Sequence, residues 1–222
     1  RLTRTKYIYD NETNISDKTQ IQFENLIVKS LGEHWSVGTK IELLTSTFNN
    51  AKFNADIFPT IEYNLFPYSE STHRQLRFAY GIGVSLNQYN DTTIYGKIAE
   101  NLGQQQLQIA YQVQEKWGSI NVSLEGSNYL HDFSKNRLEL EGSISIRIIK
   151  GLSFSVRGRV AQIHDQLSLV GEELSEADIL LQLTEMASSF NVDGSLGLTY
   201  TFGSIFNNVV NPRFGNGRRY YR

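Results

Sequence analysis

Long stretches in which apolar and polar residues alternate recur along this chain, separated by tight turns of Gly, Asn, Asp and Ser. In the clearest of them, Leu196, Leu198 and Tyr200 alternate with Ser, Gly and Thr. Successive side chains of a strand point to opposite faces, so this strand has one apolar face and one small, polar face. Soluble strands average about five or six residues, whereas a tilted strand needs about nine to eleven to cross a bilayer. The pattern predicts an all-β fold, an antiparallel up-and-down transmembrane β-barrel.

About ten strands are expected from the alternation and the turn signals. Eight and twelve strands are the alternatives, because the first two stretches are the least regular and because 92–98 extends a neighbouring strand in one interpretation. The barrel is assigned to 1–203, and 204–222 is expected to form a periplasmic C-terminal tail. The expected strands are 2–12, 20–31, 35–48, 52–66, 73–89, 104–115, 119–132, 137–149, 152–166 and 190–203.

Composition fits a bacterial outer membrane location without giving the protein's function. No run approaches the roughly 18 apolar residues of a membrane helix. The chain has no Cys, which excludes disulfides and thiolate metal sites, and its net charge of −2 gives no reason to expect nucleic-acid binding. The sequence starts at Arg1 without an apolar signal segment, so we expect the export signal to lie outside it.

The two faces of the predicted strands differ sharply in chemistry. One face carries Leu, Ile, Val, Phe and Tyr and is expected to contact lipid, and aromatic residues near the strand ends fit interfacial girdles. The other carries charges, which would cost several kcal/mol each in hydrocarbon and are therefore assigned to the lumen. Glu24 and Lys40 lie on this charged face. We expect the other charges of the face to form a mutually paired lumen charge ladder, which consists of Glu42, Asp56, Glu62, Arg77, Glu125, Glu139, Glu141, Arg147, Arg157 and Arg159. The alternative is a soluble lipocalin-like barrel or β-sandwich with the apolar face inside.

The segment Gly197 to Phe202 resembles the C-terminal β-signal of bacterial outer-membrane proteins, although here a further twenty residues follow it. The hairpins between Gln22 and Leu169, rich in Gln, Asn and Tyr, are similar to those of the salt-induced outer-membrane proteins, a family of unknown function. Thr201 to Phe214 resembles tails on outer-membrane barrels of the Bacteroidota. These resemblances imply a barrel in the outer membrane and no catalytic motif.

Catalytic and metal-binding patterns are sparse. The four histidines do not have metal-ligand spacing, and we expect no metal and no cofactor. Only two groups near the predicted outer rim combine Ser, His and an acid: His131, Asp132 and Ser134, and His164, Asp165 and Ser168. Each acid adjoins its His in sequence, so on a strand the two would point to opposite faces, and we interpret both groups as polar rim residues rather than catalytic ones.

The longest predicted connection, 167–189, contains a helical pattern. Ser175 begins a capping-box-like start, and apolar residues follow at helical spacing. We expect a short helix in an outer loop whose apolar stripe contacts a partner, packs on the rim or lies on the membrane surface. The candidate partner-contact residues are Leu174, Ile179, Leu180, Leu183 and Met186.

These observations favour an integral outer-membrane barrel that is a structural or complex-forming component and not an enzyme. Its expected partners are outer-membrane lipid and other membrane or periplasmic proteins. A narrow channel for ions or small solutes is the alternative, and an outer-membrane lipid-modifying enzyme is a third possibility. Lumen occupancy separates the first two, since a continuous paired ladder closes a pore.

Overall fold

Pairing between strands that are neighbours in sequence organises the whole fold. The computed structural model describes the backbone of residues 2–9, 12–171 and 186–202, and the side chains of 18–171 and 186–202. It contains ten β-strands and one short 3-10 helix, η1 (Tyr68–Glu70). The strands are β1 Leu2–Tyr9, β2 Glu12–Ser30, β3 Trp35–Ser46, β4 Ala51–Asn64, β5 Arg74–Tyr89, β6 Ala99–Glu115, β7 Gly118–Tyr129, β8 Asn136–Ile149, β9 Leu152–Ile163 and β10 Phe190–Tyr200.

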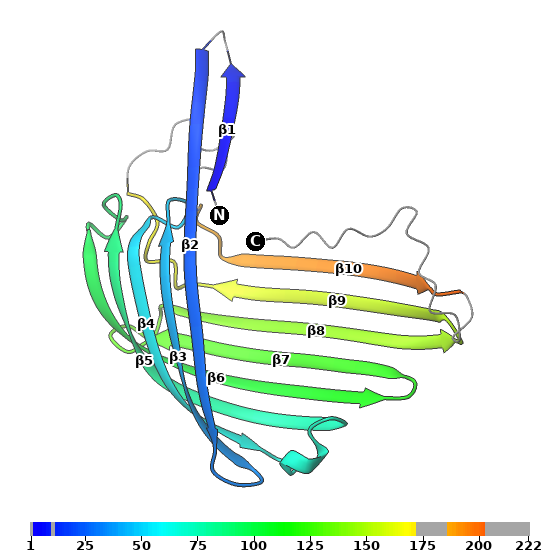
Figure 1. Cartoon of the computed structure of the whole chain (residues 1–222). Helices are drawn as coiled ribbons and strands as arrows, with labels where there is room; N and C mark the ends of the chain where they lie inside the picture. The colour runs from blue at the N-terminus through cyan, green and yellow to red at the C-terminus, as the bar shows by residue number, and fades with distance from the viewer. Residues whose placement is uncertain (1, 10–11, 172–185, 203–222) are drawn as a thin grey trace.

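Strands β2 to β10 form a nine-stranded antiparallel meander, in which each strand pairs with the strand before and after it in the chain. The sheet is strongly twisted and curled, so that β2 to β5 run steeply in Figure 1 and β7 to β10 cross them at a large angle. The predicted all-β antiparallel meander is therefore confirmed. Among the described residues no pairing joins β10 to β1 or β2, and closure of the sheet into a barrel stays a prediction.

Strand β2 is longer than predicted and has two parts. Its first part, from Glu12 to Thr19, pairs only with β1, and its second part, from Gln20 to Ser30, pairs with β3. The β1–β2 hairpin therefore projects beyond the end of β3 as a two-stranded arm (Figure 1). The predicted start at residue 20 was wrong, because residues 12–19 lack a regular alternation and are held extended by backbone pairing with β1.

Other predicted boundaries differ by a few residues. Strand β6 begins at Ala99, five residues before the predicted 104, because Ala99 to Gly103 pair with the end of β5. Residues 92–98 do not extend a strand and lie in the loop between β5 and β6, with one isolated bridge from Thr93 to Val170. No described helix is long and apolar enough to cross a membrane.

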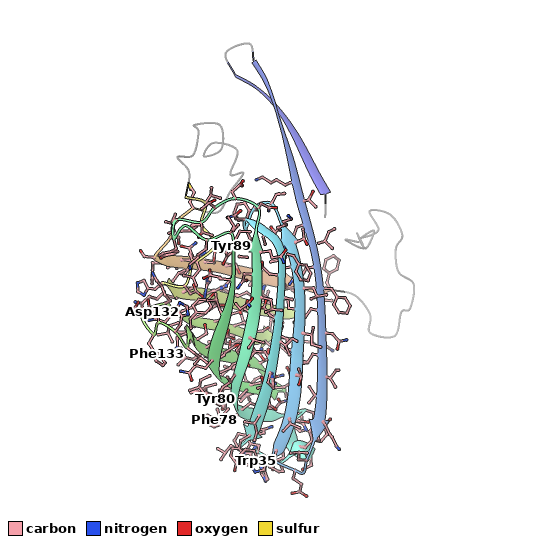
Figure 2. The ribbon with its side chains drawn as sticks, turned by 90° about the vertical axis from the view of Figure 1, so that its left-hand side faces the viewer. Trp35, Phe78, Tyr80, Tyr89, Asp132 and Phe133 are labelled. Atoms are coloured by element: carbon pink, nitrogen blue, oxygen red, sulfur yellow. The ribbon has the colours of Figure 1, made fainter. Side chains whose placement is uncertain are left out.

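Loops divide the sheet into two unlike ends. The end that we call the turn rim carries short connections at 31–34, 116–117 and 150–151, plus 65–73 with η1. The opposite end, the loop rim, carries the connections 47–50, 90–98, 130–135 and 164–189. Trp35 at the start of β3 and Tyr89 at the end of β5 mark these two ends in Figure 2. The connections of the loop rim are longer on the whole, although 47–50 is as short as 31–34 and 65–73 on the turn rim is long.

Candidate functional site: the concave face and the loop rim

Strand register gives the two faces of the sheet opposite chemistry. On the convex face, directly opposed residues of eight successive strands form a single apolar row, and most of them are exposed. The row is Trp35, Tyr63, Phe78, Ile109, Leu124, Leu140, Val160 and Val192. A second row, displaced by one residue on each strand, lies on the concave face and consists of small and polar residues. This second row is Ser36, Glu62, Ala79, Gln108, Glu125, Glu139, Ala161 and Asn191.

Strand β5 shows how the sequence produces this difference. From Tyr80 to Asn87 its burial alternates strictly, with exposed apolar side chains at even positions and buried small or polar residues at odd positions. Phe78 and Tyr80 project from the outer surface in Figure 2, whereas Ser85 and Asn87 line the concave side and are hydrogen-bonded to each other at 3.2 Å. This is the reverse of a soluble sheet, whose apolar face is covered.

The concave face encloses a cavity of about 590 Å³ lined by β2 to β7. Phe58 is its main aromatic side chain, and its ring covers Gly81 and Gly83 of β5. A Cβ at Gly83 would lie 2.2 Å from the Phe58 ring and 2.6 Å from the carbonyl oxygen of Ile57. The two glycines therefore leave the space into which the ring packs.

Only some of the predicted ladder residues are brought together as ion pairs. Arg159 pairs with Glu139 at 2.7 Å, and Arg77 with Glu62 at 3.6 Å. Lys40 bridges Glu24 and Glu42 at 3.3 and 3.1 Å. The Lys40–Glu42 pair lies within β3, and the other pairs join neighbouring strands on the concave side. Because all their members are partly exposed, each pair contributes modestly to stability.

The remaining ladder residues also have concave-face positions but no ion partner within 4.0 Å among the described side chains. Glu125 accepts a hydrogen bond from Gln108 at 3.3 Å, and Asp56 lies opposite Ser85. Glu141, Arg147 and Arg157 lie on β8 and β9 without such a contact. The ion pairs between described side chains of the ladder therefore form two separate groups and not one continuous ladder. One group lies on β2 to β5, and the other is the Arg159–Glu139 contact.

Residues 164–171, which we call the strap, cross one end of the concave face at the loop rim. The strap leaves β9 beside β8, where the His164 amide donates to the carbonyl of Asn136 at 2.8 Å. The guanidinium of Arg137 then donates two hydrogen bonds to the Asp165 carboxylate, each 2.9 Å long. Further on, the Ile94 amide donates to the carbonyl of Leu169, so the strap reaches the loop between β5 and β6.

Asn50 joins the strap to two other loops. Its side-chain amide donates to the carbonyls of Asp91 and Ser168, both at 2.9 Å, and its Oδ1 accepts from the Asp91 amide at 2.8 Å. Asn50 is 2% exposed and has a positive φ of 53°. Asn adopts this left-handed conformation more readily than most residues. Thr93, Leu167 and Leu169 are buried beside it, so this rim is tightly packed.

Sequence reasoning missed the strap, because its contacts join loops that lie far apart in the chain. The only local signal was the Asn49-Asn50 pair, a turn dipeptide that does not reveal the partners of its side chains. The strap residues Asp165 and Ser168 had been weighed as parts of a polar rim group with His164. Arg137 holds Asp165, and no hydrogen bond joins His164 to Ser168 in the described part of the chain.

The other rim group is a turn. The hydroxyl of Ser134 donates to the Asp132 carboxylate at 2.7 Å and its amide to the same oxygen at 3.0 Å. These hydrogen bonds, above all the one from the hydroxyl, hold the pKa of Asp132 below its usual value. The His131 ring packs against Tyr129, 5.8 Å between centroids. The described side chains contain no cluster of three or more His, Asp or Glu able to hold a metal.

Most of the predicted helix in the longest loop lies outside the described residues. This applies to Leu174, Ile179, Leu180 and Leu183. Met186, which is described, is half exposed and lies in irregular chain, where its carbonyl accepts a hydrogen bond from the side-chain amide of Gln166.

No family model, no curated protein and no solved structure matches this chain.

Proposed function

We propose that this chain is a structural or complex-forming β-barrel component of the bacterial outer membrane, with the convex face in lipid and the concave face as its interior. The observation that carries the proposal is the eight-strand apolar row beside a polar row displaced by one residue. Apolar surface on the outside of a curled sheet is stable where lipid covers it. A soluble lipocalin-like barrel would place that surface inside.

Strand length supports the same proposal. The strands of the meander from β3 to β10 have 11 to 17 residues, and about nine to eleven suffice for a tilted membrane strand. Exposed aromatic residues lie near both ends, with Trp35 and Trp117 at the turn rim and Phe133 at the loop rim. Aromatic rings are enriched at the two interfaces of membrane barrels.

A closed interior is proposed rather than a conducting pore. Phe58, the ion pairs of Lys40 and Arg77, and the strap across the loop rim all occupy the concave side. Side chains of this size fill the narrow interior of a small barrel. The protein would then act through its lipid contacts and through membrane or periplasmic protein partners.

Lipid exposure is tested with two neighbouring substitutions on β7. Val122→Arg places a charge on the convex face and should reduce assembly into outer-membrane fractions, at a cost of roughly 2–4 kcal/mol near the bilayer centre. Ser123→Arg is the matched control, because Ser123 lies opposite Glu141 on the concave face and the new cation has an acidic neighbour. The readout is heat-modifiable migration in gels of membrane fractions. Equal damage from both variants, or wild-type protein in the soluble fraction, would contradict the proposal.

Planar-bilayer recording distinguishes a closed interior from a channel. Purified protein reconstituted from outer membranes should give no stable ohmic conductance. A large, stable conductance would instead support the channel for ions or small solutes. Asp165→Asn, which weakens the strap at Arg137, is the informative variant, because conductance appearing only in that variant would show that the strap covers an otherwise open path.

A further inference from the structure

Three consecutive glutamines on β6 differ in how their carboxamides are used. Gln105 lies on the convex face, where its Oε1 accepts a 2.9 Å hydrogen bond from the Tyr80 hydroxyl and its Nε2 donates a 3.1 Å hydrogen bond to Oδ1 of Asn128. Gln104 and Gln106 line the cavity on the concave face. Neither of these two side chains makes a hydrogen bond within the part of the chain that the structure describes. Two carboxamides are therefore presented to the cavity with their donors and acceptors free.

Strand register places an aromatic ring beside these two carboxamides. Gln104 and Gln106 are about 7 Å apart along β6, and they lie directly opposite Gly83 and Gly81 of β5. The Phe58 ring lies across both glycines. Its Cδ1 and Cε1 atoms are the ring atoms nearest to a Cβ at Gly81, and its Cδ2 and Cε2 atoms are those nearest to a Cβ at Gly83. The cavity therefore combines one apolar ring with two free amides.

Two further polar groups around the cavity are also without a hydrogen-bond partner. Tyr129 of β7 lies directly opposite Gln104 and lines the cavity, and its hydroxyl makes no hydrogen bond to the described residues. The Oδ1 atom of Asn54 on β4 is buried and accepts no hydrogen bond. Buried polar groups of folded proteins nearly always have a partner. These free groups therefore point to a molecule that hydrogen-bonds within the cavity.

The charged side chains that line the cavity determine which kind of molecule fits. Lys40 is paired with Glu42 at 3.1 Å. Arg77 is paired with Glu62 at 3.6 Å, and Asp56 has no ion partner within 4.0 Å among the described side chains. The lining thus contains three carboxylates and two cations, which disfavours an anionic ligand. The groups that are free to bind are neutral amides, a hydroxyl and an aromatic ring.

We propose that this cavity binds a neutral sugar, a monosaccharide or a disaccharide. Carboxamides and phenol hydroxyls both donate and accept hydrogen bonds, as sugar hydroxyls do, and the C–H groups of a sugar ring pack on apolar surface such as the Phe58 ring. The cavity volume of about 590 Å³ lies within the range of small-molecule sites, roughly 300–1,000 Å³. The strap crosses one end of this face, so the sugar is bound and not conducted. Such a site uses only groups of the concave face and therefore does not depend on the proposed membrane location.

Sugar binding is tested by NMR with the purified full-length protein in detergent micelles. The protein is titrated with glucose, N-acetylglucosamine and maltose. At least one of these sugars should shift the side-chain NH₂ resonances of Gln104 and Gln106 and leave those of Gln105 in place. Glucuronate, which carries a carboxylate on the same ring as glucose, is the charged comparison. It should bind at least tenfold more weakly than the best neutral sugar.

Single substitutions on β6 locate the site. Gln104→Leu and Gln106→Leu remove the free carboxamides, and each should weaken sugar binding by about 2- to 10-fold, the effect of one hydrogen bond. Because neither carboxamide has a hydrogen bond in the described chain, both variants should keep the wild-type unfolding midpoint. Gln105→Leu is the matched control, because Gln105 has the same side chain on the opposite face. It should keep the wild-type affinity for the sugar.

Four results would overturn the proposal. None of the three neutral sugars shifts the two glutamine resonances, which would mean that the cavity holds only water. Glucuronate binds as tightly as the best neutral sugar. The Gln104→Leu and Gln106→Leu variants bind sugar as tightly as the wild type does. Gln105→Leu weakens binding as much as they do. Membrane fractionation of the same protein reports on the proposed function separately, so either proposal can fail alone.

Discussion

Asn50 and Ser168 are 118 positions apart, and the side-chain amide of Asn50 donates a 2.9 Å hydrogen bond to the carbonyl of Ser168. The same side chain makes two further hydrogen bonds to Asp91. One buried amide therefore connects the loop between β3 and β4, the loop between β5 and β6, and the strap.

Replacing Asn50 should loosen the loop rim. Asn50→Ala removes all three hydrogen bonds and places alanine, which disfavours a positive φ, at this position. We therefore expect the free energy of unfolding to fall by about 2–4 kcal/mol. Asn50→Gly tolerates the φ but lacks the hydrogen bonds, and should fall between wild type and Asn50→Ala. Denaturant unfolding in lipid vesicles measures the ranking. A neutral Asn50→Ala would mean that the rim does not depend on this side chain.

Arg159 neutralises one of two opposed carboxylates. Glu125 and Glu139 face each other directly across β7 and β8, a like-charge arrangement that is unfavourable unless compensated. Arg159 bonds Glu139 and Gln108 bonds Glu125. Arg159→Gln should lower stability by about 0.2–1 kcal/mol, the range for exposed pairs. Adding Glu139→Gln should restore much of that loss, and a double-mutant cycle measures it; strictly additive effects would argue against coupling.

Gly83 should not tolerate a side chain. Gly83→Ala brings a Cβ against the Phe58 ring and the carbonyl of Ile57, and overpacking of this kind costs about 1–3 kcal/mol. Gly126→Ala is the matched control, because the nearest atom to its added Cβ is 3.7 Å away on Leu138. Unfolding midpoints in vesicles should fall for the first variant and stay near wild type for the second.

The turn at Asp132 should weaken in acid. The pKa of Asp132 is lowered in the folded protein by the Ser134 hydrogen bonds, so the charged carboxylate favours the folded turn. That contribution is fully present above the unfolded pKa of about 4 and is lost as the pH falls through the lowered folded value. The Ser134 amide shift, followed by NMR from pH 7 to pH 2, should report this titration. Asp132→Asn should abolish it, and an unchanged profile in that variant would refute the assignment.

Sequence alternation predicted most of the strands and their faces, because burial on one side imposes a period of two that each strand carries locally. Strand β5 is one such case, because its exposed and buried residues alternate from Tyr80 to Asn87. The strap and the ladder pairing were less accessible, since they depend on which distant groups the curvature brings together. Asp165 is informative here: its neighbour in sequence is His164, whereas its hydrogen-bond partner Arg137 is 28 positions away.

Neighbour-only pairing also has a consequence for the order of folding. From β3 to β9, each strand of the meander can add to the previous one through a short closing loop, which carries a small entropic cost. The contact between Asn50 and Ser168 cannot form until β4 to β9 are in place, because it spans 118 positions. The contacts of the strap would then form late in folding. Variants that weaken them should speed unfolding more than they slow folding.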